Sequence, residues 1–158
     1  MEARLNPFRT EVGPQLVKHL VSAHHALVGS AIDSATLELV NIRASQLNGC
    51  SGCLDMHTKE ALHAGEDPVR LSLVAAWRDA TVFTEAERAA LELTEAGSRL
   101  ADVGHVDDDV WARVAKHYDD EQLMALVAQI ALINAFNRLN VMTAQPAGSY
   151  VAGSLQAH

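Results

Sequence analysis

Apolar residues recur along this chain at the three- and four-residue spacing of amphipathic helices, and no segment alternates as a half-buried strand does. The pattern predicts an all-α protein, because the apolar runs extend over several helical turns. The predicted helices cover residues 14–28, 35–47, 50–65, a short stretch from 68, then 85–100, 107–117 and 120–143.

Local signals mark where several of these helices begin and end. Asp33 or Ser34 is expected to cap the second helix, since short polar side chains bind the free N–H groups of a first turn. The Asn48-Gly49 pair predicts the turn that ends this helix. Thr84, with a glutamate three residues later, predicts a capping box at the start of the fifth helix.

The composition favours a single helical core. Apolar residues make up 49% of the 158 residues but aromatic residues only 4%, so alanine and leucine must supply the core. A chain of this length usually forms one domain. We therefore expect one domain over residues 1–158, with residues 146–158 as a flexible or partner-docked tail, because the proline at its start blocks a longer last helix.

The last predicted helix is the most apolar one. Its run LMALVAQIALI is too short to span a bilayer and is typical of a buried core helix. Asn134, Asn137 and Arg138 follow this run, and buried polar groups need partners, so we expect them to bond across helices or between subunits. A helix this apolar has more surface than one small core covers, which predicts a homo-oligomer.

The charge balance narrows the classes of partner. Twelve basic and 20 acidic residues give a formal charge of −8, and no basic run interrupts the acidic surface. Such a surface repels phosphate groups, so we expect neither nucleic acid nor an anionic membrane as a partner. The first residues form no apolar signal segment, and we expect a cytoplasmic protein. In a reducing compartment, a close cysteine pair is more often catalytic or metal-binding than structural.

Cys50 and Cys53 are the two cysteines of the chain, and both occur in the stretch NGCSGCLDMH. With His57 they fall at positions i, i+3 and i+7 of the third predicted helix, so the three side chains share one face. Both cysteines are expected in the first turn, where free N–H groups and the helix dipole favour the reactive thiolate. His57 comes one turn later and suits a base that takes the Cys53 proton.

Glu38 is the carboxylate of the preceding, largely apolar helix. Partial burial would make it a better base near neutral pH. If the two helices fold back about the turn, Glu38, His57 and Cys53 form a ladder of proton carriers, directly or through water. Two other interpretations stay open: Cys50, Cys53, His57 and Glu38 are also a sound zinc ligand set, and two cysteines can simply be small buried side chains.

The spacing from Glu38 to His57 resembles the E-x11-C-x2-C-x3-H signature of AhpD-like proteins, which belong to the carboxymuconolactone decarboxylase superfamily. Residues 38–67, 75–96 and 130–141 are similar to the family as well, so the resemblance covers nearly the whole chain. It implies an AhpD-like helical bundle that assembles into dimers, trimers or hexamers.

The resemblance also implies a thiol peroxidase or disulfide oxidoreductase that acts on hydroperoxides, with no bound metal or cofactor. By this analogy, Cys53 attacks the peroxide, Cys50 resolves the sulfenic acid to a disulfide, and His57 and Glu38 relay the proton. The best-known members are re-reduced by a lipoyl group on a partner protein. They carry a histidine just before the second cysteine, where this chain has Gly52. The decarboxylase branch of the superfamily lacks the cysteine pair.

Overall fold

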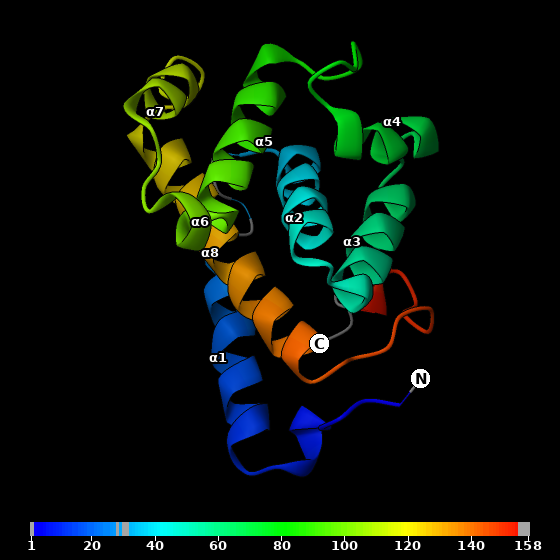
Figure 1. Ribbon diagram of the computed structural model, residues 1–158. Coiled ribbons are helices and arrows are strands. Elements are labelled where there is room, and N and C mark those ends of the chain that lie inside the picture. The colour runs from blue at the N-terminus through cyan, green and yellow to red at the C-terminus, as the bar shows by residue number, and fades with distance from the viewer. Residues whose placement is uncertain (1, 28, 30–31, 155–158) are drawn as a thin grey trace.

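The computed structural model describes residues 2–27, 29 and 32–154, and these form helices and connecting loops with no β-strand among them (Figure 1). The predicted all-α class is confirmed. The elements are η1 (Pro7–Arg9), α1 (Val12–His25), α2 (Ser34–Asn48), α3 (Ser51–His63), α4 (Pro68–Leu73), η2 (Val74–Ala76), α5 (Glu85–Ser98), α6 (Leu100–Val103), α7 (Asp108–Val114) and α8 (Asp120–Met142).

The helices begin and end at the predicted local signals. Asp33 caps α2, because its Oδ1 accepts the N–H of Thr36 at 2.8 Å. Gly49 ends α2 in the left-handed conformation, with φ of 65°. Thr84 and Glu87 form the predicted capping box at the start of α5. These signals act within a few residues, so they can be recognised without knowledge of the tertiary structure.

Several boundaries differ from the prediction, and α7 ends at Val114 rather than near residue 117. Helix α1 starts before Pro14, which its first turn tolerates because the first N–H groups have no partner inside a helix. It ends at His25, and Val28 lies outside the described residues. The predicted helix over 85–100 is divided, because Arg99 leaves the helical conformation with φ of −108°, and the short α6 follows until Gly104.

Helix α2 lies at the centre of the bundle and packs against α8, α5 and α3 (Figure 1). Helix α8 is also long and apolar enough, by length and composition alone, to cross a membrane, as core helices often are. Here it carries part of the core, as the apolar run predicted. The largest of the almost fully buried side chains include Leu39, Val40 and Ile42 of α2, Leu91 of α5, and Leu126 and Ile133 of α8.

Buried amides connect α8 to α2. The Asn48 amide donates hydrogen bonds to Oδ1 of Asn134 at 2.9 Å and to Oδ1 of Asn137 at 2.8 Å. Asn137 in turn donates to Oγ of Ser45 at 3.0 Å. The predicted cross-helix role is therefore confirmed for the two asparagines. Arg138 instead bonds within α8, to the carbonyl and side-chain oxygens of Asn134.

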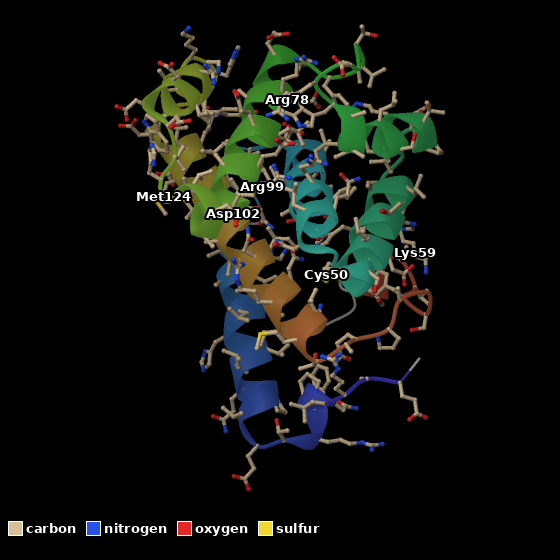
Figure 2. The ribbon with its side chains drawn as sticks, in the orientation of Figure 1. Cys50, Lys59, Arg78, Arg99, Asp102 and Met124 are labelled. Carbon is tan, nitrogen blue, oxygen red and sulfur yellow. A yellow bond between two sulfur atoms is a disulfide. The ribbon has the colours of Figure 1, made fainter. Side chains whose placement is uncertain are left out.

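The segment after α8 turns back along α3. Asp55 accepts the backbone N–H groups of Gly148 and Tyr150, and Lys59 donates to the carbonyl oxygens of the same two residues. Figure 2 shows Lys59 on this side of α3. The hydrogen bond from Lys59 is the main cause that lowers the pKa of Asp55. The charged pair on α3 thus holds residues 148–150 beside the helix that carries Cys53.

Candidate active site

The turn between α2 and α3 places the two cysteines. Because Gly49 reverses the chain direction, Cys50 follows in an extended conformation and is the N-cap of α3. The prediction placed Cys50 inside the first turn, whereas it stands one residue before it. Its sulfur takes the role of a capping oxygen: Cys50 Sγ accepts the N–H of Cys53 at 3.3 Å. Both sulfurs therefore lie at the positive end of the helix dipole.

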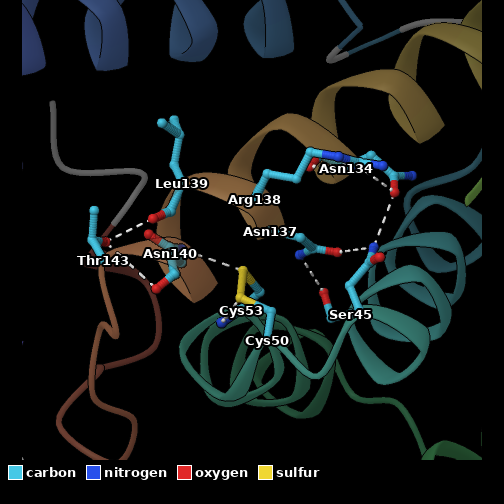
Figure 3. The surroundings of a disulfide bond; sticks show 10 residues. Ser45, Cys50, Cys53, Asn134, Asn137, Arg138, Leu139, Asn140 and Thr143 are labelled. Atoms are coloured by element: carbon cyan, nitrogen blue, oxygen red, sulfur yellow. Dashed lines mark hydrogen bonds between the residues drawn. A yellow bond between two sulfur atoms is a disulfide. The ribbon is translucent and has the colours of Figure 1, made fainter. Parts of the chain in front are cut away.

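Cys50 and Cys53 are joined by a disulfide bond, with 5.4 Å between their Cα atoms (Figure 3). Each residue is only 1% exposed, and the pair packs against Ala44 of α2 and Ile133 of α8. Sulfurs bonded to each other are not thiolate ligands. Within the described ranges, no group of three or more His, Cys, Asp or Glu side chains lies close enough together to hold a metal ion.

Glu38 and His57 meet across the interface between α2 and α3. His57 Nδ1 lies 2.8 Å from Glu38 Oε2, and the histidine is 7% exposed. The Glu38 side chain is 24% exposed, which agrees with the predicted partial burial. A carboxylate needs a donor, so Nδ1 is the donating nitrogen of this contact, and Nε2 is the ring nitrogen that remains for exchange with Cys53. His57 follows Cys53 by one helical turn on the same face of α3.

Asn140 of α8 also contacts the cysteine pair, and the sequence analysis did not predict this contact. Its Nδ2 donates a hydrogen bond to Cys53 Sγ at 3.3 Å (Figure 3). The two residues are 87 positions apart, and nothing in the local pattern links them. A polar residue near the end of an apolar helix is usually interpreted as a solvated end. The available signal was its spacing of three and seven from Asn137 and Ile133, which place it on the buried face.

An open pocket with a volume of about 270 Å³ lies beside the disulfide. Its lining includes Cys50 and Asn140 together with residues 144–147, whereas Cys53 is not part of it. Gly52 faces the same segment: a Cβ atom there would lie 3.6 Å from the carbonyl oxygen of Pro146, an ordinary contact. The chain after α8 thus takes up space next to the position where the best-known AhpD-like proteins carry a histidine.

Comparison with known proteins decides the family. Residues 14–96, more than half of the chain, match the sequence profile of the Carboxymuconolactone decarboxylase family. This chain belongs to the carboxymuconolactone decarboxylase family. Within the described residues, it has the all-helical, AhpD-like fold of that superfamily and carries a CxxC pair, Cys50 and Cys53.

Relatives of this family member span nearly its whole length. It is 37% identical over 139 residues to the uncharacterized protein YdfG of Bacillus subtilis (strain 168), covering 88% of this chain and 94% of that protein. The crystal structure of a protein of unknown function from Agrobacterium tumefaciens, proposed to be the antioxidant defence protein AhpD, matches with a TM-score of 0.86 and 30% identity. That match covers 94% of this chain and 100% of the other.

A more distant likeness concerns the fold alone. The debrominase Bmp8, crystallised as a cysteine-to-alanine variant in complex with 2,3,4-tribromopyrrole, matches with a TM-score of 0.76 at 20% identity. This match covers 86% of the present chain and 72% of Bmp8. The chain thus shares its helical scaffold with a protein named as a debrominase, and because one fold can carry different chemistries, activity has to be argued from the site.

Proposed function

We propose that this protein is a thiol-dependent peroxidase that reduces hydroperoxides through Cys53 and Cys50. One observation carries the proposal: the cysteine pair is bonded at the start of α3, and the hydrogen-bonded pair of His57 and Glu38 lies one turn further in. A thiolate attacks peroxides, and the helix start favours that form. A buried imidazole held by a carboxylate is suited to exchange the proton.

The oxidation half of the cycle starts from the reduced pair. The Cys53 thiolate, whose proton His57 has taken, attacks one oxygen of the hydroperoxide. The S–O bond forms, the O–O bond breaks, and the His57 proton leaves with the alkoxide as an alcohol. Cys50 then attacks the Cys53 sulfur of the sulfenic acid, so that the disulfide forms and hydroxide leaves with the Cys50 proton as water. The cysteine pair thereby supplies both electrons.

The reduction half needs an external dithiol, which we propose is carried by a protein, for example as a lipoyl group. One thiolate of the dithiol attacks Cys50 Sγ, forming a mixed disulfide and releasing the Cys53 thiolate. The second thiol of the reductant then closes its own disulfide and releases Cys50. The pocket supports this direction of attack, because Cys50 lines it and Cys53 does not.

The test is peroxide consumption by the reduced protein. The purified chain is reduced, freed of reductant and mixed with cumene hydroperoxide, and we expect one equivalent of peroxide to be consumed with formation of the Cys50–Cys53 disulfide. Cys53→Ser should abolish consumption. Cys50→Ser should still consume one equivalent but stop at a sulfenic acid on Cys53, detectable by dimedone labelling. Undiminished activity in Cys53→Ser would refute the role of this cysteine.

The two other interpretations remain testable alternatives. If the protein is a non-enzymatic zinc protein, elemental analysis of the purified chain should give stoichiometric zinc and unreactive thiols. If the cysteines are inert, the reduced native protein should not react with a thiol reagent until it is unfolded. The peroxidase proposal predicts the opposite in both assays, because it requires a reactive Cys53 without bound metal.

We further propose that the protein acts in the cytoplasm as a homo-oligomer, with neither nucleic acid nor membrane as a partner. Support for assembly comes from α1. Among the described residues of this helix only Gly13 is buried, and Val12 beside it is 71% exposed. Phe8 of η1 is likewise 68% exposed. Apolar surface of this kind is typical of an interface. Light scattering tests this, and a strict monomer at all concentrations would contradict it.

A further inference from the structure

Asn140 is placed on the face of α8 that looks toward the disulfide. Ile133, Asn137 and Asn140 follow one another at spacings of four and three residues, so they lie along one side of the helix. Ile133 packs against both cysteines, and Asn140 reaches the sulfur of Cys53 from further along the same side. The amide group therefore approaches Cys53 from the α8 side, whereas His57 belongs to α3 itself (Figure 3).

The two asparagines on this face differ in what they bind. Asn137 is fully buried and its amide is used for structure, since it accepts from Asn48 and donates to Ser45. In the described part of the chain, the side-chain amide of Asn140 makes one hydrogen bond, the one to Cys53 Sγ. A side chain kept for helix packing alone would not need a donor aimed at sulfur.

The strength of this hydrogen bond depends on the redox state of Cys53. A sulfur in a disulfide is neutral and a weak acceptor, so an N–H donor at 3.3 Å contributes little there. A thiolate is charged, and hydrogen bonds to charged groups are about twice as strong as neutral ones. The donor is thus already in position in the oxidised form for a charge that appears only on reduction.

We propose that Asn140 is a catalytic residue that stabilises the Cys53 thiolate by hydrogen bonding. In the reduced protein it favours the thiolate before attack on the peroxide. During reduction it favours the same thiolate as the leaving group, when an incoming thiolate bonds to Cys50 and the electron pair of the S–S bond goes to Cys53. The proposal deepens the proposed function, on which it rests for the choice of Cys53 as the working sulfur.

The experiment measures the ionisation of one thiol. The reduced protein is alkylated with iodoacetamide over a range of pH. Mass spectrometry with peptide fragmentation follows the modification of Cys53 separately from that of Cys50. Two variants remove the donor: Asn140→Leu replaces the amide with an apolar group, and Asn140→Asp keeps the shape but adds a negative charge. Met124→Ala is the control, because Met124 is on the same helix but is 60% exposed and does not line the disulfide pocket.

We expect the midpoint of Cys53 alkylation to rise by about one pH unit in Asn140→Leu and by more in Asn140→Asp, since a nearby negative charge disfavours a thiolate. Below the midpoint, less of Cys53 is thiolate in Asn140→Leu, which slows alkylation. A thiolate of higher pKa is also more nucleophilic, and this partly offsets the loss, so the net slowing should be only roughly threefold. Met124→Ala should match the wild type. A residue that only supports packing would leave the midpoint in Asn140→Leu at the wild-type value.

Midpoints in both Asn140 variants within about 0.2 pH units of the wild type, with unchanged circular dichroism, would overturn the proposal. If Asn140→Leu fails to fold, Asn140→Ala, which removes the donor without adding a charge, carries the test in its place. The proposed function is tested separately, by peroxide consumption of the wild-type protein. If the wild type consumed no peroxide, the alkylation midpoints of wild type and variants would still show whether Asn140 stabilises the Cys53 thiolate.

Discussion

The carboxylate of Glu38 and the imidazole of His57 lie 2.8 Å apart, and they come from two helices that reverse direction at Gly49. The two residues are 19 positions apart in the sequence, and a single tight turn brings them together. Because both helices also pack against each other, the contact is fixed by the backbone rather than by a mobile loop. Its chemical role is open to direct tests.

The first prediction concerns Glu38→Gln. The amide keeps the shape and a hydrogen-bond acceptor but lacks the charge that stabilises a protonated His57. We expect the rate of peroxide reduction to fall about tenfold to a hundredfold with the fold unchanged. Stopped-flow consumption of peroxide measures this. Glu92→Gln is the matched control, because Glu92 pairs with Arg113 elsewhere and should leave the rate unaltered.

The second prediction uses a double-mutant cycle of His57 and Glu38. His57→Gln should slow the reaction of Cys53 with peroxide while the fold stays intact. If Glu38 acts through His57, adding Glu38→Gln to His57→Gln should cause almost no further loss. The same stopped-flow rates give the coupling. Losses that simply multiply would mean that the two residues act independently.

The third prediction concerns the stability contributed by Asn137, which is 0% exposed. Asn137→Ala removes the partner of Ser45 and one partner of Asn48, and it leaves a small cavity. We expect the free energy of unfolding to fall by about 2–4 kcal/mol, measured by urea denaturation. Met124→Ala on the same helix is the control, because Met124 is 60% exposed and should cost under about 0.5 kcal/mol.

The fourth prediction concerns Glu95, a buried carboxylate of α5. Burial favours a raised pKa, but hydrogen bonds from Trp77, Arg78 and Arg43 outweigh it and hold the pKa of Glu95 below its usual value of 4.5. The folded state thus binds this proton less readily than the unfolded state. The stability that Glu95 contributes should be fully present above about pH 4.5 and lost as the pH falls through its lower folded pKa.

Urea denaturation of the wild type and Glu95→Gln at several pH values checks this dependence. The wild type should be the more stable protein near neutral pH, and the difference in the free energy of unfolding should shrink as the pH is lowered from about 5 to about 3. A difference that stays constant over this range would contradict the assignment of the acid-labile contribution to Glu95.

The fifth prediction compares two substitutions at Gly52. A Cβ atom at this position meets Pro146 at an ordinary contact distance, so Gly52→Ala should raise the free energy of unfolding by about 0.5 kcal/mol through a less flexible unfolded chain. Gly52→His carries a ring that must displace the segment at Pro146. We expect it to lower stability and to make the disulfide react faster with dithiothreitol. Equal behaviour of the two variants would show that this segment does not limit access.

The sequence allowed the fold class and much of the cysteine region to be predicted because their determinants are local. Asp33 and Thr84 cap helices through bonds to residues three positions away, and Gly49 marks its own turn. Cys53 and His57 share a face by helical spacing alone. The contact of Glu38 with His57 needed one further assumption, an antiparallel pair of helices, which the short turn made reasonable.

The contacts that could not be predicted join residues far apart in the chain. Asn140 meets Cys53, and Asp55 holds Gly148, only because α8 packs against α3 and the chain then turns back. No periodicity encodes such an arrangement, since the packing of several helices together determines it. The break at Arg99 between α5 and α6 was missed for another reason, because arginine is otherwise a good helix former.

Residues close to both ends of the chain are tied together next to the disulfide pocket. Arg4 donates its backbone N–H to the carbonyl oxygen of Thr143, and Gln145, which lines the pocket, donates to the carbonyl oxygen of Leu5. An affinity tag or fluorescent fusion joined ahead of Arg4 would therefore lie near the pocket through which we propose that a bulky reductant reaches Cys50. Kinetic work on this protein should remove such additions, or place labels at the exposed loop around Gly104 instead.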